Sequence, residues 1–404
     1  MTKQTTQIPA LRFPEFASKS EWESKELREI FDSFSGGTPS TSDKRYYGGE
    51  IPFIRSAEIA KEKTELLLTE EGLNNSSAKL VNKGDLLVAL YGANSGDVAI
   101  SKINGAINQA ILCMQSDYSN SFTYNFLSFK KDWIVSRYIQ GGQGNLSGEI
   151  VKSIRLLFPK PQEQQKIAAC LSALDALIAA HTDKLDALKE HKKGLLQKLF
   201  PQKGERLPQL RFSEFEGDGD WVETTLEQVA DYQNGKAHEK DIDENGNYTV
   251  VNSKFISTEG KTVKYSEKAF CLANLGDILM VLSDVPNGKA IAKCFYVDEE
   301  DKYSVNQRIC RITATECDSH FLLYIMDRNT YFLSFDDGVK QTNLRKADVL
   351  KFGFRIPTDP DEQIKIAACL SAVDDLITAQ QEKIEELQQH KKGLMQGLFP
   401  KIEN

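Results

Sequence analysis

Apolar residues recur at alternating intervals of four and three residues in two long stretches of the chain. The first stretch has Ile167, Leu171, Leu174, Ile178, Leu185, Leu188, Leu195 and Leu199, and the second has Ile366, Leu370, Val373, Ile377, Ile384, Leu387, Leu394 and Leu398. This spacing places the apolar side chains on one narrow face of a helix, as in the seam of a coiled coil. Pro161 and Pro360 stand where such helices begin, and Phe-Pro follows each stretch. We therefore predict two long paired helices, the first spanning roughly 57 Å over residues 162–199.

Each seam is interrupted by polar residues at matching places. His181 and Lys192 break the first seam, and Gln380 and Lys391 break the second. A solvated interruption or a fraying helix end explains such residues, and so does a device that fixes the register of two paired helices. We favour the register interpretation, with antiparallel helices and a globular domain at each end of the pair.

Outside the helices, short apolar runs predict strands and amphipathic runs predict helices. The predicted strands are 86–90, 278–282, 106–114 and 305–312, and the predicted helices are 122–138 and 320–332. Two of these strands follow a Gly-Asp turn and are apolar throughout, as buried strands are. This mixture predicts mixed α/β domains.

The chain is a duplication with an offset of 199 residues. Residues 161–178 and 360–377 are identical at 14 of 18 positions, and the opening segment 8–16 also reappears 199 residues later. The residues between these matching ends, 35–140 and 234–336, share little. The matching ends of the two halves suggest that both halves bind the same kind of partner. The divergent residues between those ends suggest that the two halves recognise different targets.

The predicted fold class is α+β, with two pseudo-repeated mixed α/β domains separated by a pair of long antiparallel coiled-coil helices. The predicted boundaries are 1–160 for the first α/β domain, 161–204 for the first helix, 205–359 for the second domain and 360–404 for the second helix. With 404 residues, the chain is long enough for each domain to bury its own core.

Charge and composition narrow the class of protein. The net charge is −8, with +3 in residues 1–204 and −11 in residues 205–404. Proteins that bind nucleic acid alone are usually basic, so DNA binding would need local basic patches or a partner. Seven cysteines without a C-x-x-C pair and five scattered histidines argue against a disulfide framework or structural zinc. No apolar run has the length of a membrane span or a secretory signal, and we expect a cytoplasmic protein.

Polar loops supply the candidate recognition residues. The stretch 35–42 is rich in Gly, Ser and Thr, and Lys44-Arg-Tyr-Tyr47 follows it. Glycines allow close approach of the backbone, and Arg, Lys, Asn and Gln carry the donors that read base edges. An ordinary surface loop explains the same composition, and a turn explains the repeated Gln-x-Asn at 143–145 and 341–343. The candidate DNA-binding residues are Thr38, Ser40, Lys44, Arg45, Tyr46, Arg55, Gln143 and Asn145 in the first half, and Asn252, Lys254, Asn287, Lys289, Gln341, Asn343 and Arg345 in the second.

The sequence contains none of the usual catalytic motifs. It has no G-x-x-x-x-G-K-[ST] phosphate loop, no G-x-G-x-x-G opening a helix, and no Asn-Pro-Pro-Tyr of the kind found in amino-methyltransferases. Pro360-Asp361 with Glu362 and Lys365 resembles part of a nuclease site, but the twin helix begins Pro161-Gln162, which favours helix capping. We expect no catalytic residue, no metal site and no cofactor bound by this chain.

The repeated motifs resemble the specificity subunit of type I restriction-modification systems. The resemblance rests on two variable domains, each followed by a long helix opening Pro-x-Glu-Gln-x-x-Ile, and on the Gly-Gly-Thr-Pro-Ser loop and the Leu-Arg-Phe-x-Glu-Phe…Trp segment. It implies two target recognition domains for the two halves of a bipartite DNA sequence, with the helices as a ruler for the spacer. It also implies two modification subunits that bring S-adenosylmethionine, and restriction subunits that bring ATP and Mg-dependent translocation and cleavage.

The second half departs from this pattern, because it has Asn234-Gly-Lys236 in place of the Gly-Gly-Thr-Pro-Ser loop. Its half-site is therefore expected to differ. Three alternatives stay open: a coiled-coil adaptor that binds no DNA, an enzyme with an unrecognised site, and a specificity module of another methyltransferase system.

Overall fold

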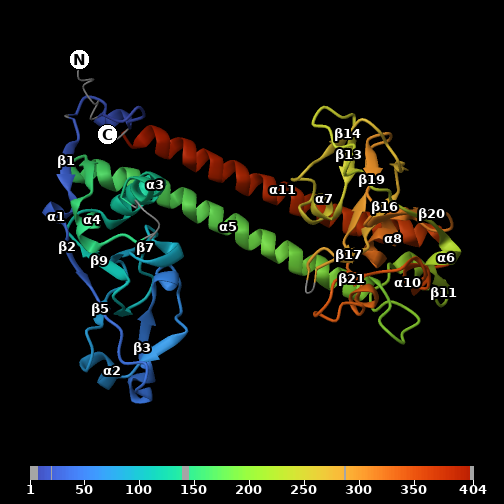
Figure 1. Cartoon of the computed structure of the whole chain (residues 1–404), viewed down its shortest axis with the longest axis horizontal. Helices are drawn as coiled ribbons and strands as arrows, with labels where there is room; N and C mark the ends of the chain where they lie inside the picture. The colour runs from blue at the N-terminus through green and yellow to red at the C-terminus, as the bar shows by residue number, and fades with distance from the viewer. Residues whose placement is uncertain (1–7, 20, 139–144, 286–287, 401–404) are drawn as a thin grey trace. The chain divides into compact units, whose positions relative to one another are not determined.

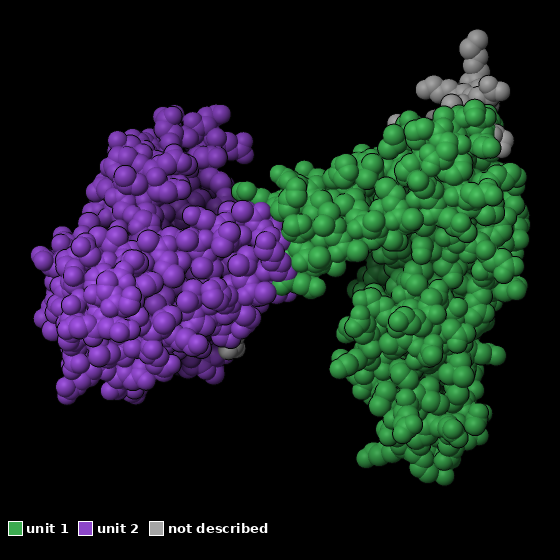
Figure 2. Space-filling model, turned by 180° about the vertical axis from the view of Figure 1, so that it is seen from behind, with its two compact units in different colours: residues 1–183, 382–404 green, residues 184–381 purple. Residues whose placement is uncertain are grey.

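The computed structural model describes residues 8–19, 21–138, 145–285 and 288–400. The chain divides into two compact units, which Figure 2 draws in green and purple: unit 1, residues 1–183 with 382–404, and unit 2, residues 184–381. No helix in the described part of the chain combines the length and the apolarity that crossing a membrane requires.

Two helices of 39 residues each run through both units (Figure 1). The helix α5 (Pro161–Leu199) begins in unit 1 and ends in unit 2, and α11 (Pro360–Leu398) begins in unit 2 and ends in unit 1. In unit 1 the start of α5 shares a buried core with the end of α11, and in unit 2 the end of α5 shares a core with the start of α11. The two long helices and their antiparallel pairing are therefore confirmed within each unit.

The α/β domain of unit 1 precedes α5. Its strands are β1 (Glu23–Glu26), β2 (Asp32–Ser35), β3 (Tyr47–Ile54), β4 (Leu66–Leu68), β5 (Lys79–Val81), β6 (Leu86–Ala89), β7 (Val98–Ile100), β8 (Gly105–Ile107), β9 (Ile111–Gln115) and β10 (Arg155–Phe158). Its helices are α1 (Leu27–Ile30), α2 (Glu70–Asn74), α3 (Asn120–Tyr138) and α4 (Gly148–Ser153), with 3₁₀ turns η1 (Pro14–Phe16), η2 (Lys44–Tyr46), η3 (Ser56–Glu58) and η4 (Gly92–Asn94). The strands form an antiparallel sheet β2-β9-β6-β7, a mixed sheet β4-β3-β8-β5 and the pair β1-β10.

The α/β domain of unit 2 lies between α5 and α11. Its strands are β11 (Val222–Thr225), β12 (Ala230–Asn234), β13 (Tyr248–Val251), β14 (Tyr265–Ser266), β15 (Leu272–Ala273), β16 (Ile278–Val281), β17 (Ser283–Asp284), β18 (Cys294–Tyr296), β19 (Tyr303–Val305), β20 (Ile309–Ala314), β21 (Thr342–Asn343) and β22 (Gly353–Ile356). Its helices are α6 (Leu226–Val229), α7 (Ser253–Ser257), α8 (Ser319–Met326), α9 (Thr330–Leu333) and α10 (Lys346–Leu350), with the 3₁₀ turn η5 (Ser213–Phe215).

Both domains have the same strand order, although their sequences share little. The sheet β12-β20-β16-β18 repeats β2-β9-β6-β7, and β14-β13-β19-β15 repeats β4-β3-β8-β5, including its one parallel pair. The fully buried strands β6 and β16 follow the Gly-Asp turn in each domain. Gly84 and Gly276 have φ of +99° and +90° in this turn, a conformation that favours glycine. The two Gly-Asp pairs thus mark equivalent places in one fold.

Three sequence-based predictions of single elements are wrong. The segments predicted as strands at 106–114 and 305–312 each contain the end of one strand and the start of another, in different sheets. A turn at Asn108 and Asn306 separates them; the Asn108 carboxamide, for example, accepts a hydrogen bond from the backbone of Ala110. The helix predicted at 320–332 is divided into α8 and α9. Arg328, between them, has φ of +53°, which interrupts a right-handed helix.

A buried ion pair joins the opening segment of each repeat to the start of its long helix. Arg12 donates two hydrogen bonds of 2.7 Å to the Glu163 carboxylate on α5. Arg211 makes the equivalent bonds of 2.8 Å to Glu362 on α11. Both partners are almost completely buried in each pair. Glu362 therefore holds the opening segment of its repeat against the start of α11 through Arg211.

The two lysines that interrupt the seams, Lys192 and Lys391, also form ion pairs across the helices. Lys391 on α11 lies 2.5 Å from Asp175 on α5 within unit 1, and Lys192 on α5 lies 2.6 Å from Asp374 on α11 within unit 2. The two pairs are equivalent under the offset of 199 residues. They place opposite charges at fixed positions along the seam, which is what the register interpretation requires.

Candidate nucleic-acid interface

The Gly-Gly-Thr-Pro-Ser loop of unit 1 is held close to the mixed sheet. A Cβ atom on Gly36 would lie 1.8 Å from the carbonyl oxygen of Ile107, so only glycine fits there. Thr38 donates a 2.6 Å hydrogen bond to the Gln109 side chain, and the Ser40 hydroxyl lies 2.8 Å from the Ser42 hydroxyl. Thr38 and Ser40 are exposed, so the loop presents hydroxyl groups from a fixed backbone.

The same close approach occurs in unit 2, where the motif is absent. A Cβ atom on Gly235 would lie 2.1 Å from the carbonyl oxygen of Asn306, next to the strand equivalent to β8. Gly235, in the Asn-Gly-Lys segment, thus replaces Gly36. The two loops have different side chains, but in both a glycine lies against a backbone carbonyl oxygen at the end of the equivalent strand.

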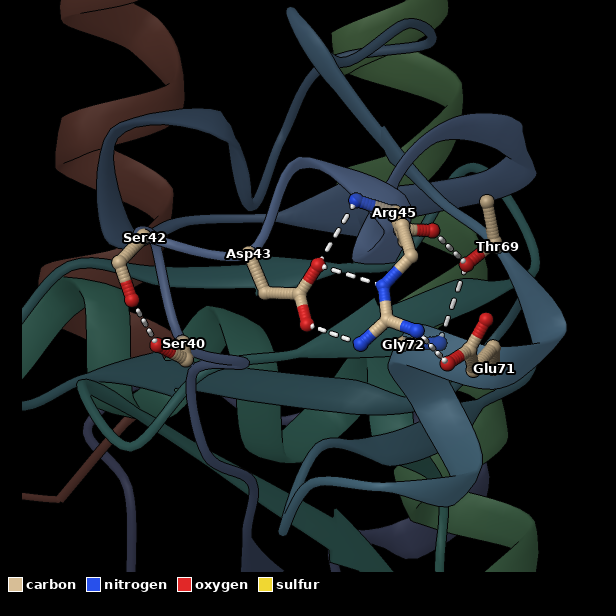
Figure 3. A network of polar contacts seen from close by, with 7 residues as sticks. All are labelled: Ser40, Ser42, Asp43, Arg45, Thr69, Glu71 and Gly72. Carbon is tan, nitrogen blue, oxygen red and sulfur yellow. Dashed lines mark hydrogen bonds and ion pairs between the residues drawn. The ribbon is translucent and has the colours of Figure 1, made fainter.

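Arg45 is an exposed cation of this loop, and its guanidinium is hydrogen-bonded to Asp43 (Figure 3). Asp43 accepts hydrogen bonds from the Arg45 backbone N–H at 3.1 Å, from Nε at 3.0 Å and from Nη2 at 2.7 Å. Glu71 lies 3.6 Å from Nη1. The hydrogen bonds with Asp43 raise the pKa of the guanidinium and lower the pKa of the Asp43 carboxyl. The Arg45 side chain is nevertheless 70% exposed.

The two residues beside Arg45 have different surroundings. Lys44 is exposed, whereas Tyr46 is half-buried, and its carbonyl oxygen accepts a hydrogen bond from the backbone N–H of Thr69. All three belong to η2, and this cluster of Lys44, Arg45 and Tyr46 follows the Thr38–Ser40 loop in the chain.

Arg55 follows β3, as predicted, but its guanidinium is turned toward the protein. Nε donates a 2.9 Å hydrogen bond to Glu58, and Nη2 lies 2.5 Å from Glu65. The Glu58 side chain is only 2% exposed and also accepts a hydrogen bond from the Glu65 backbone. Arg55 thus closes the η3 turn and is less available to a ligand than Arg45.

The candidate amides at the end of the unit 1 domain lie apart from this cluster in the chain. Asn145 is exposed, and its side-chain oxygen accepts a 3.1 Å hydrogen bond from the Gly92 backbone. Its partner in the sequence pattern, Gln143, lies outside the described residues.

In unit 2, Asn252 occupies the position that Arg55 has in unit 1. It caps α7, directly after β13, by accepting a 2.9 Å hydrogen bond from the Phe255 backbone. Lys254, on the first turn of α7, is exposed.

The remaining candidates of unit 2 come together at the small sheet β17-β21. Gln341 donates a 2.6 Å hydrogen bond to Ser283, and Asn343 is the strand partner of Ser283. Asp284 accepts hydrogen bonds from the backbones of Ala290 and Ile291, which brings the exposed Lys289 back to the same loop. Asn287 lies outside the described residues.

Arg345 follows this cluster and begins α10. Its backbone N–H donates a 3.0 Å hydrogen bond to Asp348, and its side chain is exposed. The structure therefore gathers Lys289, Gln341, Asn343 and Arg345 around the sheet β17-β21, while Asn252 and Lys254 follow β13 of another sheet.

Two features with clear structural roles were not predicted as such: the pairing of Arg12 with Glu163 and that of Arg211 with Glu362. The signal was present, because both partners recur in the repeated motifs at the same offset. Within residues 8–19, 21–138, 145–285 and 288–400, no group of three His, Cys, Asp or Glu side chains is arranged to hold a metal ion.

The sequence of this chain is similar to that of a known protein family. The family model described as the type I restriction modification DNA specificity domain matches residues 19–190 and, a second time, residues 218–389. The type I restriction enzyme MjaVIII specificity subunit of Methanocaldococcus jannaschii is 23% identical over 417 aligned residues, covering 97% of this chain and 94% of that protein. The MjaIX specificity subunit of the same organism is 31% identical over 168 residues, or 39% of each chain.

Solved structures have the same fold. The S subunit of the type I restriction-modification system from M. genitalium has a TM-score of 0.65 and 14% identity, covering 98% of this chain and 100% of that chain. A chain described under complex assembly and conformational transition of the type I R-M system has a TM-score of 0.58 and 15% identity, covering 94% and 97%. Because the family model matches both repeats and most of the chain, this protein belongs to the type I restriction-modification DNA specificity family.

Proposed function

We propose that this chain is the non-catalytic specificity subunit of a type I restriction-modification complex, in which each α/β domain reads one half of a bipartite DNA target. One observation carries the proposal: the same strand order occurs twice on nearly identical frames, while the loops that hold the candidate residues differ. A fixed scaffold with variable loops suits the reading of two different half-sites. The curated relatives support it, since they are named specificity subunits of type I restriction enzymes.

The partners in this proposal are double-stranded DNA, two modification subunits and restriction subunits. Each unit offers an equivalent surface at the opening segment of its repeat. Leu11 donates its backbone N–H to Gly397 near the end of α11, and Leu210 donates to Lys198 near the end of α5. Both leucine side chains are exposed. Two equal surfaces suit two copies of one modification subunit.

The chemistry is assigned to those partners. S-adenosylmethionine would bind the modification subunits, and ATP and Mg would act in the restriction subunits. Their contacts with DNA would add to those of a chain whose net charge is −8. The long helices would set the number of base pairs between the half-sites.

Methylated-adenine mapping tests the proposal. The host genome is sequenced for methylated adenines with this gene present and deleted, and the reconstituted complex is tested for a salt-dependent shift of a duplex that contains the mapped sites. We expect one bipartite motif to lose methylation on deletion. An unchanged methylation pattern, or methyl transfer by the purified chain alone, contradicts the proposal.

A further inference from the structure

The backbone of Arg45 is fixed on both sides. Its N–H donates to Asp43, and its carbonyl oxygen accepts a 2.8 Å hydrogen bond from the Thr69 hydroxyl. Thr69 also caps α2 by accepting a hydrogen bond from Gly72. A Cβ atom on Gly72 would lie 2.3 Å from the carbonyl oxygen of Tyr46, so α2 packs directly against η2. Arg45 therefore projects from a rigid turn, as a residue that must meet a ligand in one geometry should.

The hydrogen bonds of the guanidinium leave one edge open. Asp43 occupies the Nε and Nη2 edge with bonds of 3.0 and 2.7 Å. Glu71 lies 3.6 Å from Nη1, which is longer than a hydrogen bond. Figure 3 shows the guanidinium between these two carboxylates. The Nη1 and Nη2 edge, a fork of two parallel donors, is free of hydrogen bonds to the described residues.

A fork of two donors matches one base edge in the major groove. Guanine presents two adjacent acceptors there, O6 and N7, whereas adenine presents an acceptor beside a donor. The charges nearby also favour a base over a phosphate. Two carboxylates offset the single positive charge of Arg45, so it would attract a phosphate weakly.

We propose that Arg45 is a specificity-determining residue that reads a guanine through its Nη1 and Nη2 donors, and that Asp43 is the positioning residue that holds this fork outward. The inference rests on the proposed function, because it names the base class and the residue for one half-site. It also separates Arg45 from Arg55, whose guanidinium is bound to Glu58 and Glu65.

The test uses the full chain in its complex with modification subunits. The target is first mapped with the unchanged chain, and binding is then measured to this duplex and to duplexes with one base pair changed at a time. Arg45→Ala, Arg45→Lys and Asp43→Asn are compared. Asp43→Asn keeps an oxygen that can accept the Arg45 backbone N–H but removes the carboxylate charge.

We expect Arg45→Ala to reduce discrimination at a single G·C pair by about 5-fold to 150-fold, the usual range for a bidentate base contact. Arg45→Lys should reduce it by a smaller factor, because an ammonium group can reach the guanine but lacks the planar fork of a guanidinium. Asp43→Asn should reduce discrimination at the same pair by a smaller factor. The dependence of binding on salt should stay unchanged, because no phosphate contact is lost.

Arg155→Ala is the matched control. Arg155 makes a 2.9 Å ion pair with Glu26 in the same unit and is similarly exposed, but it lies on β10 beside the long helix. This variant should keep every base preference.

The inference is overturned if Arg45→Lys binds like the unchanged chain while Arg45→Ala weakens all sequences equally with a shallower salt dependence. That pattern would identify a phosphate contact. Unchanged base preferences in all Arg45 variants would overturn it as well. Failure of the proposed function is distinguishable, because the unchanged chain would then give no methylated motif or no base preference at all.

Discussion

In unit 2, Nζ of Lys192 on α5 lies 2.6 Å from the carboxylate of Asp374 on α11. The hydroxyl of Tyr324, on α8, donates a 2.8 Å hydrogen bond to the same carboxylate. Three elements therefore meet at Asp374: both long helices and the α/β domain. The pair is half-buried, so it is screened less by solvent than a surface ion pair.

Reversing the charge of Lys192 should destabilise the helix pair. Lys192→Asp places two carboxylates together, and we expect the free energy of unfolding to fall by about 1 kcal/mol. Combining Lys192→Asp with Asp374→Lys should recover part of this loss, because opposite charges again face each other, although a lysine at 374 cannot accept the Tyr324 hydrogen bond. Urea unfolding of the four chains measures the coupling.

Lys193 provides the control for this pair. It is exposed and pairs with Glu190 on its own helix. Lys193→Asp should change stability by less than about 0.5 kcal/mol. Equal losses for Lys192→Asp and Lys193→Asp would show that the contact between the helices is unimportant.

Removing Glu362 should be much more costly. Glu362→Gln leaves Arg211 with an uncompensated charge in a buried site, and we expect a loss of about 3–5 kcal/mol in the stability of unit 2. Glu163→Gln should have the same effect on unit 1 through Arg12. Differential scanning calorimetry can follow the two units. A loss below about 1 kcal/mol for either variant would refute this assignment.

Glu58 should make unit 1 sensitive to acid. Burial raises its pKa, but hydrogen bonds from Arg55 and from the backbones of Glu65 and Arg55 outweigh burial and hold the pKa below its ordinary value of 4.5. A lowered pKa in the folded state stabilises the protein above the unfolded pKa, and this contribution is lost as the pH falls through the folded pKa.

The measurement compares unfolding free energies of the unchanged chain and Glu58→Gln as a function of pH. The variant should be less stable at neutral pH, and the difference should shrink as the pH falls below 4.5. A difference that stays constant throughout this range would contradict the assignment.

Lengthening both long helices should change the spacer of the DNA target. Asp175 and Lys192 lie on either side of 179–186, and their partners Lys391 and Asp374 lie on either side of 380–387. Four residues inserted into each segment add roughly 6 Å of helix, which is close to two base-pair steps of about 3.4 Å. Methylated-adenine mapping should give a longer spacer and unchanged half-sites. Altered bases with the old spacer would oppose this prediction.

Exchanging residues 1–160 for those of a relative should change one half-site only. The two α/β domains have separate cores, so each should carry its own reading function. Mapping the chimera checks this. A change in both half-sites, or a folded chimera that no longer assembles with modification subunits, would contradict the modular interpretation.

The long helices could be predicted to within a residue because their signals are local. Pro161 and Pro360 are favourable at a helix start, and the four-three spacing persists to Leu199 and Leu398. The shared strand order of the two domains could not be predicted, because residues 35–140 and residues 234–336 have little sequence in common. A buried strand requires apolar side chains of suitable size, and many different sequences satisfy that requirement. Two unlike sequences can therefore form the same strand order.

The candidate site could be predicted only as a set of donor residues. Arg45 and Arg55 look alike in the sequence, yet one is presented and the other is bound inward. Arg55 is bound by Glu58, three positions away, and also by Glu65, ten positions away. The more distant carboxylate near Arg45 is Glu71, 26 positions away, and it lies beyond hydrogen-bond distance. Spacing along the chain contains no information on such contacts.

The place of Phe399 has a consequence for the order in which the protein folds during synthesis. Phe399 packs on Phe126 in unit 1 with ring centroids 4.5 Å apart, whereas its counterpart Phe200 packs on Phe321 in unit 2. The ribosome makes Phe200 before the domain that needs it, but it makes Phe399 after both domains. Unit 2 can therefore complete its core as soon as its own stretch has emerged. Unit 1, although made first, completes its aromatic cluster only after the second repeat has been translated.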